Sequence, residues 1–345
     1  MSLFSEINEQ PDRIKRLLSS QRKGVEKIAE AIRKHNIDYV FLAARGTSDN
    51  AGRYANYLLG AMNGLPLALA TPSLFTYYKK PPQLRNALVI GVSQSGKSPD
   101  IVSVLEEGKR QGCMTLAITN EPNSPLANVS DFVLDVHAGP ERAVAATKTY
   151  TAELMAVAML STALSGNNKG WGELGKIPAW MNETLKQNDF IAEAAQRYRY
   201  MDQAVVLGRG FNYATAFEWA LKLKELTYII AEPYSSADFA HGPIAMVESG
   251  YPVFAVAAKG RVFNSMLGML QRLRSEISAE LVVISNDKRV SSLAQVSLKI
   301  PADVPEWLSP MISILPAQLF AANLTLAKGY DVEHPRSIRK VTETK

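Results

Sequence analysis

The chain carries one pattern of strands and turns twice, and this duplication restricts the folds that it can adopt. A shift of 164 positions superimposes segments of the two halves: Arg45-Gly46 on Arg209-Gly210, Leu88–Val92 on Pro252–Val256, and Gly96 on Gly260. At Ile118 and Ile284 the shift has become 166, which indicates a two-residue insertion in the second copy. Repeats of this length indicate two duplicated domains and not a solenoid.

Both copies alternate short apolar runs with longer amphipathic stretches, which is typical of a parallel sheet flanked by helices. Buried strands are predicted at Tyr39–Ala44, Ala87–Val92, Met114–Thr119, Phe132–Val136, Ala204–Gly208, Val253–Ala257, Leu281–Ser285 and Val296–Ile300. Helices are predicted at Asn50–Ala61, Asp100–Gln111 and Ala214–Tyr228. The expected fold is therefore α/β, with two tandem domains that each form a flavodoxin-like or Rossmann-like three-layer sandwich.

The length of 345 residues also favours two domains. The segment Ser165 to Trp180 is rich in Gly and Asn and contains a Pro, so it is predicted to connect the domains. The predicted parts are a helical lead-in (1–24), a first domain (25–165), a linker helix region (166–199), a second domain (200–325) and a C-terminal tail (326–345).

Composition excludes several classes of protein. Hydrophobic residues make up 47% and charged residues 21%, which is ordinary for a globular protein. The N-terminus has no apolar signal region, and no uninterrupted apolar run reaches the roughly 18–20 residues of a membrane span. Cys113 is the only cysteine, so neither an internal disulfide nor a cysteine zinc cluster can form. We expect a cytoplasmic protein without metal or organic cofactor.

The net charge of +5 is not gathered into long basic runs or stripes alternating with aromatic residues. Neither nucleic acid nor a membrane is therefore an expected partner. A slight excess of positive charge is compatible with an anionic substrate.

The loop after the predicted strand 87–92 has the composition of a phosphate-binding site. Ser93, Ser95 and Ser98 offer hydroxyl donors, and Gly96 can adopt the positive φ that turns successive N–H groups inward. Ser98 fits an N-cap with Pro99 as the first helical residue, and the helix N-terminus attracts anions. Ser and Gly are also common in ordinary turns, so the loop alone does not decide the matter.

The second copy lacks the hydroxyl groups of the first. Ser93-Gln94-Ser95 is replaced by Ala257-Ala258-Lys259, and Thr47-Ser48 is replaced by Phe211-Asn212. The unequal copies predict one phosphate site per chain, in the first domain.

Several motifs together show a resemblance to a known family, and it covers nearly the whole chain. FLAARGTSDNAG, GVSQSGKSPD and AVAATKTYTAEL resemble the SIS (sugar isomerase) family. VVLGRGFNYATAFEWALKLKELTYIIAEPYSSADFAHGPIAMVE is similar to the isomerase half of glucosamine-6-phosphate synthase. The resemblance implies a sugar-phosphate site formed by Thr47, Ser48, Ser93, Gln94, Ser95 and Ser98, lined by the backbone of Val144, Ala145 and Ala146. The synthases typically have Ser at the position of Ala146.

A second group of residues lies in the second half. Lys222 and Glu225 are spaced i, i+3 on one helix face, and His241 follows in FAHGP. In isolation they are typical of a surface ion pair and a structural histidine, and Lys340 of a frayed tail. The resemblance implies that Glu225 moves a proton between C1 and C2, His241 opens the sugar ring, Lys222 handles oxygen protons, and Lys340 forms an imine with the ketose. It also implies a tail that closes the active site, and a homodimer in which the histidine crosses the interface.

The resemblance leaves the reaction open. The chain reaches the isomerase-like region within about twenty residues of Met1 and contains no N-terminal cysteine nucleophile, so glutamine-dependent synthesis is not expected. The ending K-V-T-x-T from Lys340 looks like that of SIS-type amino-sugar-phosphate deaminases. The leading hypothesis is conversion of glucosamine 6-phosphate and water to fructose 6-phosphate and ammonia. Alternatives are a fructosamine-6-phosphate (Amadori) deglycase, galactosamine- or tagatose-type reactions, and a sugar-phosphate sensor without catalysis.

Overall fold

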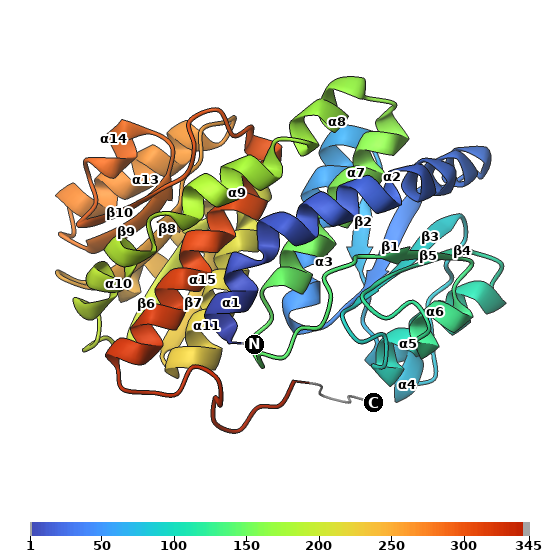
Figure 1. Cartoon of the computed structure of the whole chain (residues 1–345), viewed down its shortest axis with the longest axis horizontal. Helices are drawn as coiled ribbons and strands as arrows, with labels where there is room; N and C mark the ends of the chain where they lie inside the picture. The colour runs from blue at the N-terminus through green and yellow to red at the C-terminus, as the bar shows by residue number, and fades with distance from the viewer. Residues whose placement is uncertain (1, 341–345) are drawn as a thin grey trace. The chain divides into compact units, whose positions relative to one another are not determined.

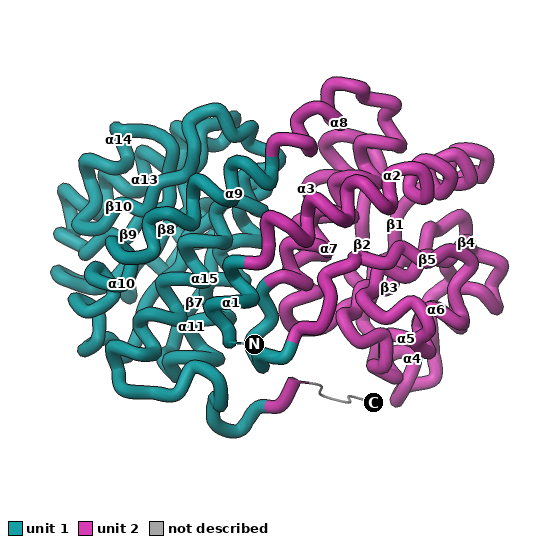
Figure 2. The backbone as a smooth tube through the Cα atoms, viewed as in Figure 1, with its two compact units in different colours: residues 1–8, 142–147, 177–338 teal, residues 9–141, 148–176, 339–345 magenta. Residues whose placement is uncertain are grey.

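The computed structural model describes residues 2–340, which form two compact units (Figure 2). Unit 1 comprises residues 1–8, 142–147 and 177–338, and unit 2 comprises residues 9–141, 148–176 and the chain from 339 onward. Each unit contains one five-stranded sheet with helices on both faces (Figure 1). The predicted α/β fold with two tandem parallel sheets is confirmed.

The sheet of unit 2 is entirely parallel, with the order β2-β1-β3-β4-β5. Its strands are β1 (Tyr39–Ala43), β2 (Leu67–Leu69), β3 (Ala87–Ser93), β4 (Met114–Thr119) and β5 (Phe132–Asp135). The chain order reverses between β1 and β3, and open parallel sheets bind ligands beyond the carboxyl ends of the strands at such a point. The serine-rich loop predicted to hold phosphate begins there, at the end of β3.

Helices cover both faces of this sheet. They are α2 (Gln10–Lys34), α3 (Gly46–Asn63), α4 (Ser73–Thr76), α5 (Pro99–Arg110), α6 (Pro125–Val129), α7 (Lys148–Ser165) and α8 (Asn168–Leu174). Alternate strand residues such as Phe41 and Val89 pack on one face with residues of α4, α5 and α6. Helices α2, α3 and α7 pack together, and contacts with the strands place them on the sheet.

Unit 1 repeats the same arrangement. Its elements are α1 (Leu3–Asn8), α9 (Ile177–Leu185), α10 (Asn188–Gln196), β6 (Gln203–Gly208), η1 (Gly210–Asn212), α11 (Tyr213–Thr227), β7 (Ile230–Ser235), α12 (Ser236–Ala240), η2 (Pro243–Met246), β8 (Pro252–Val256), α13 (Phe263–Ser275), β9 (Glu280–Ser285), α14 (Lys288–Ser291), β10 (Val296–Lys299), η3 (Glu306–Leu308) and α15 (Ser309–Ala327). The sheet order β7-β6-β8-β9-β10 has the same topology as that of unit 2, which is the structural form of the sequence repeat.

The eight predicted strands are present, each within one residue of its predicted ends. Strands β2 and β7, which lie at corresponding sheet edges, were not predicted from the sequence. Strand β2 has only three residues, none of them buried, and β7 contains Pro233 and an exposed Ile230. Edge strands tolerate proline because one side of their backbone has no partner strand. Such segments do not show the apolar run that marks a central strand.

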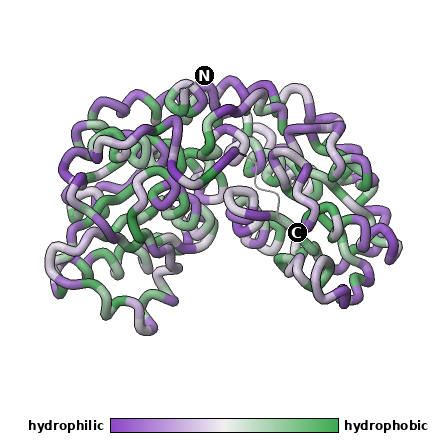
Figure 3. The backbone as a smooth tube through the Cα atoms, turned by 90° about the horizontal axis from the view of Figure 1, so that it is seen from below, coloured by the Kyte–Doolittle hydropathy of each residue, from purple (hydrophilic) through white to green (hydrophobic). Residues whose placement is uncertain are grey.

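One segment, Glu306–Ala327, is apolar and long enough to span a membrane by length and composition, but 89% of its most apolar window is buried inside the protein. Phe320 of this segment packs against Trp219 and Phe254, and the three ring centroids are 5.0–6.2 Å apart. Burial on all sides identifies α15 as a core helix of unit 1. Figure 3 shows hydrophobic stretches running through the interior, with hydrophilic ones mainly along the outer turns.

Candidate active site

The loop after β3 is held in one conformation by hydrogen bonds from several sides. Gly96 has φ +60°, and its amide donates to the Ser93 Oγ at 3.1 Å. The amide of Asn120 donates to the Gln94 carbonyl at 3.2 Å, and that of Leu126 donates to the Gly96 carbonyl at 3.0 Å. The predicted left-handed conformation of Gly96 is confirmed, and the loop is preorganised before any ligand binds.

The start of α5 leaves unused hydrogen-bond donors. Ser98 is the N-cap and Pro99 the first helical residue, as predicted, but the Ser98 side chain makes no capping hydrogen bond. Within residues 2–340 neither the amide nor the hydroxyl of Ser98 donates to the protein, and the Ser93 hydroxyl accepts a bond without donating one. These donors, with the positive end of the helix dipole, suit an oxyanion.

The loop after β1 lies beside this one because β1 and β3 are paired in parallel register. Helix α3 begins at Gly46 and not near Asn50, so Thr47 and Ser48 lie in its first turn. The Ser48 amide donates to the Arg45 carbonyl, and its Oγ donates to the buried Glu153 at 2.8 Å. An oxyanion would reach Ser48 only by replacing one of these bonds, which the sequence did not indicate.

An ion pair ties the two loops together. The Arg45 Nε lies 2.8 Å from Oδ2 of Asp100, whose side chain is fully buried in the first turn of α5. Asp100 also accepts the amide of Ile101 at 2.9 Å. The sequence placed Asp100 only at the start of a predicted helix and did not indicate this long-range partner.

Replacement of Gly96 with Ala should weaken both folding of unit 2 and phosphate binding. The added Cβ would lie 2.0 Å from the Ser124 Oγ, in a backbone conformation that L-residues avoid. Strain of this kind costs about 1–3 kcal/mol before the clash is counted. Gly60→Ala is the matched control, because Gly60 lies in α3 of the same unit with open space around it. Urea unfolding and phosphate titration should separate the two variants; equal behaviour would contradict a loop dependent on Gly96.

The predicted Lys222–Glu225 pair is present in unit 1, with a buried lysine and a partly exposed glutamate. The Lys222 side chain is 1% exposed, with Nζ 2.5 Å from Oε2 of Glu225 and 3.3 Å from Oε1 of Glu218. Glu218 is fully buried, one helical turn before Lys222 on α11. The sequence analysis missed Glu218, although its i, i+4 spacing to Lys222 was a usable signal.

Electrostatics fix the charge of this cluster. Burial by itself lowers the pKa of Lys222, but the charges of Glu218 and Glu225 outweigh burial and raise that pKa above its ordinary value. Lys222 is therefore an ammonium that donates hydrogen bonds and cannot act as a base near neutral pH. The Glu225 carboxylate is 24% exposed and within reach of a ligand. Buried charges are costly in folding, and their presence beside an accessible carboxylate is typical of a functional site.

His241 lies in a different environment of unit 1. It caps the C-terminus of α12 and precedes Gly242, whose φ is +144°. Its side chain is exposed and makes no hydrogen bond or ion pair with the described residues, so the structure does not bond it to Lys222 or Glu225.

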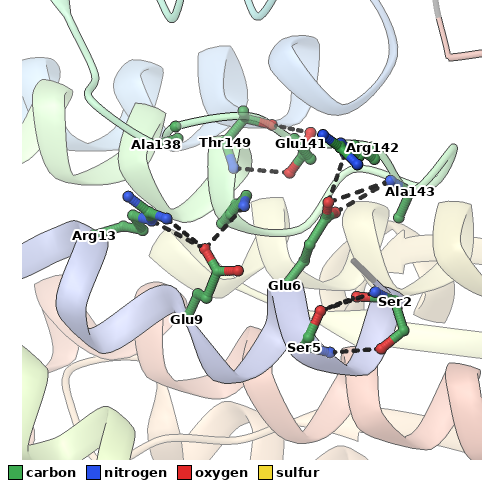
Figure 4. A network of polar contacts seen from close by, with 12 residues as sticks. Ser2, Ser5, Glu6, Glu9, Arg13, Ala138, Glu141, Arg142, Ala143 and Thr149 are labelled. Carbon is green, nitrogen blue, oxygen red and sulfur yellow. Dashed lines mark hydrogen bonds and ion pairs between the residues drawn. The ribbon is translucent and has the colours of Figure 1, made fainter.

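The tail lysine Lys340, the last described residue, is held by unit 2. Its Nζ lies 2.6 Å from Oε2 of Glu141, whose side chain is fully buried. Glu141 also accepts the Thr149 amide at 3.1 Å and the Thr149 hydroxyl at 2.8 Å (Figure 4). The sequence did not predict Glu141, and residues 341–345 of the predicted tail lie outside the described part.

The segment predicted to line the ligand through its backbone is anchored within unit 1. Glu6 of α1 accepts the amide of Arg142 at 2.6 Å and that of Ala143 at 3.3 Å (Figure 4). Val144 and Ala146 are half-buried, and Ala145 is buried. Glu6 is fully buried and comes from the far N-terminus, so its role could not be predicted from sequence spacing.

Residues 2–340 contain neither a metal-binding group nor a reactive thiol. Residues 2–340 contain no group of three His, Cys, Asp or Glu side chains arranged to hold a metal. Cys113 is buried with its thiol donating to the Leu84 carbonyl, and burial raises its pKa. A neutral buried thiol is not a nucleophile.

A protein-family model for the SIS domain matches residues 35–163 and again residues 198–328. The chain belongs to the SIS domain family. This SIS protein is 33% identical to glutamine--fructose-6-phosphate aminotransferase [isomerizing] of Pyrococcus horikoshii over 98% of its own length. It covers 57% of that relative, so the chain spans little more than half the length of the curated protein that it matches.

Solved structures of related proteins support the same family assignment for the SIS protein. The C-terminal domain of glucosamine-fructose-6-phosphate aminotransferase from Francisella tularensis has a TM-score of 0.87 at 28% identity, with 96% of this chain and 98% of that chain covered. A Silicibacter pomeroyi protein described as a "putative phosphosugar isomerase" has a TM-score of 0.87 at 32% identity, with 96% of this chain and 100% of that chain covered. The resemblance to the isomerase half of the synthase is thus confirmed, while the roles of individual residues stay predictions.

Proposed function

We propose that this SIS protein is an enzyme that converts an amino-sugar phosphate by an aldose–ketose proton transfer. The observation that carries the proposal is the Glu225 carboxylate held by the buried Lys222 ammonium on α11. The proposal assigns proton transfer to this cluster of unit 1 and phosphate binding to the serine-rich loop of unit 2. The names of the matched relatives, a fructose-6-phosphate aminotransferase and a phosphosugar isomerase, support a sugar phosphate as the substrate.

The leading reaction is hydrolytic deamination of glucosamine 6-phosphate. His241 transfers a proton to the ring oxygen as the ring opens to the C1 aldehyde. Glu225 takes the proton from C2 and returns it to C1, while the Lys222 ammonium stabilises the oxygen that becomes negative at C1. That oxygen gains a proton as the amino nitrogen at C2 loses one. The product carries an imine at C2. Water adds to that carbon and ammonia leaves, which gives fructose 6-phosphate.

Two further roles belong to the same proposal. Lys340 is proposed as the tail lysine that forms an imine with a ketose, and in the structure its Nζ pairs with the buried carboxylate of Glu141. The tail that carries Lys340 is proposed to close over a bound sugar.

Ammonia release from a panel of substrates tests the reaction. We expect turnover with glucosamine 6-phosphate, measured by coupling the released ammonia to NADH oxidation through glutamate dehydrogenase and by detection of fructose 6-phosphate. Galactosamine 6-phosphate and a fructosamine 6-phosphate are the discriminating substrates. Release only from the fructosamine phosphate would replace deamination with an Amadori deglycase, and binding without any turnover would identify a sensor.

The proposal includes a homodimer in which His241 serves the partner's site, because its exposed side chain makes no hydrogen bond or ion pair within residues 2–340. Mixing two inactive variants, Glu225→Gln and His241→Asn, is expected to restore activity. Random exchange of subunits makes half of the dimers mixed, each with one intact site, so about a quarter of the wild-type activity should return. No recovery after verified subunit exchange would place His241 and Glu225 in one chain's site.

A further inference from the structure

Unit 1 contains a counterpart of the phosphate loop, and a side chain of the protein itself is bound there. The loop between β8 and α13 aligns with the loop between β3 and α5 at the 164-residue shift. Gly260 aligns with Gly96, and the N-cap residue Val262 aligns with the N-cap residue Ser98. The serines are lost from this copy, but the backbone amides at the start of the helix remain.

The carboxylate of Glu306 accepts hydrogen bonds from these amides. The amide of Arg261 donates to Oε2 of Glu306 at 2.8 Å, and the amide of Val262 donates to Oε1 at 3.3 Å. A Cβ added to Gly260 would lie 2.0 Å from the carboxylate carbon of Glu306, so only glycine admits the group at this distance. The two amides correspond to those of Lys97 and Ser98 in the first copy, where the Ser98 amide donates to no described residue.

The position of Glu306 corresponds to a ligand-lining position of the first copy. It is the third residue before α15, just as Ala145 is the third residue before α7, the corresponding helix of the first copy. The segment around Ala145 is the one implied to line the phosphate through its backbone. The same position in the second copy therefore supplies an anion of its own.

We propose that the Glu306 carboxylate is a built-in substitute for a phosphate group, which closes the second loop to phosphate esters and other oxyanions. Carboxylates and phosphates are both stabilised by amides and the dipole at a helix N-terminus. Removal of the Glu306 carboxylate leaves the amides of Arg261 and Val262 open to an external anion. Two basic residues, Lys259 and Arg261, belong to the same loop. The inference goes beyond the proposed function, since it concerns the copy without the serines and holds whichever sugar is bound.

The test compares Glu306→Ala with Glu276→Ala in the full chain. Glu276 is the matched control because it is exposed at the C-terminus of the same α13 and its loss changes net charge equally. Without anions, Glu306→Ala should unfold at a lower temperature than Glu276→Ala. Inorganic phosphate, at constant ionic strength against chloride, should raise the melting temperature of Glu306→Ala by more than it raises that of wild type or Glu276→Ala.

Crystals soaked in selenate locate the ion. We expect an anomalous peak at the amides of Arg261 and Val262 in Glu306→Ala and none there in wild type. A folded Glu306→Ala variant without this peak and without the extra phosphate response overturns the proposal, and Glu306 is then an ordinary helix cap. If Glu306→Ala does not fold, Glu306→Gln keeps the shape of the side chain and removes its charge. Glu306→Gln should then show a smaller extra rise of melting temperature with phosphate. The absence of that rise would also overturn the proposal.

Discussion

Replacement of Glu225 with Gln should reduce turnover of glucosamine 6-phosphate by about 10²–10⁴-fold, the range that a positioned general base contributes. Gln keeps the size of the side chain and its hydrogen bond from Lys222, but it has no carboxylate to receive the C2 proton. Because the lost interaction belongs to the transition state, kcat should fall with little change in KM. The measurement is initial-rate ammonia release, with phosphate-ester binding followed by calorimetry.

Glu232→Gln is the control for this substitution, since Glu232 is an exposed carboxylate of the same unit. It should retain wild-type kinetics. If Glu225→Gln keeps its turnover, proton transfer belongs to another residue and the proposed mechanism fails. If it loses only binding, the protein is a sensor whose ligand contacts Glu225.

Removal of the ammonium by Lys222→Met should be the most destabilising single change considered for unit 1. Breaking a buried ion pair costs about 3–5 kcal/mol, because the fully buried Glu218 loses the positive charge beside it. Turnover should also fall, since Glu225 loses its hydrogen-bond donor. Urea unfolding measures the stability, and ammonia release measures the activity.

The double variant Glu218→Gln/Lys222→Met separates these two effects. Neutralising Glu218 removes the buried negative charge, so part of the lost stability should return. Activity should not return, because Glu225 still lacks the ammonium. Full recovery of both properties would show that Lys222 serves only to neutralise Glu218.

The pH dependence has a definite sign. The folded-state pKa of Lys222 is raised, so its contribution to stability is fully present below the unfolded value of about 10.4 and is lost as pH rises through the folded value. The stability difference between wild type and Lys222→Met should therefore be constant with respect to this group between pH 6 and pH 9. It should narrow only at strongly alkaline pH.

Local features of the site could be predicted from sequence because they depend on neighbouring residues. The positive φ of Gly96 and the N-cap at Ser98 follow from turn chemistry and helix capping, which act within a few positions of the chain. The i, i+3 spacing of Lys222 and Glu225 likewise follows from the helix period. The six central strands among the eight predicted ones could be found because burial on both faces gives an uninterrupted apolar run.

The sequence by itself determined a duplicated α/β fold, a serine-lined turn in one copy, and a lysine and glutamate on one helix face. Only the tertiary structure decided the hydrogen-bond partners of five carboxylates: the buried Glu6, Glu141, Glu153 and Glu218, and the half-buried Glu306. Four of these five bond to residues more than 7 positions away, and no periodic pattern encodes a partner at that separation. A buried carboxylate must find hydrogen bonds wherever the fold brings donors within about 3 Å, and that proximity exists only once the chain has folded.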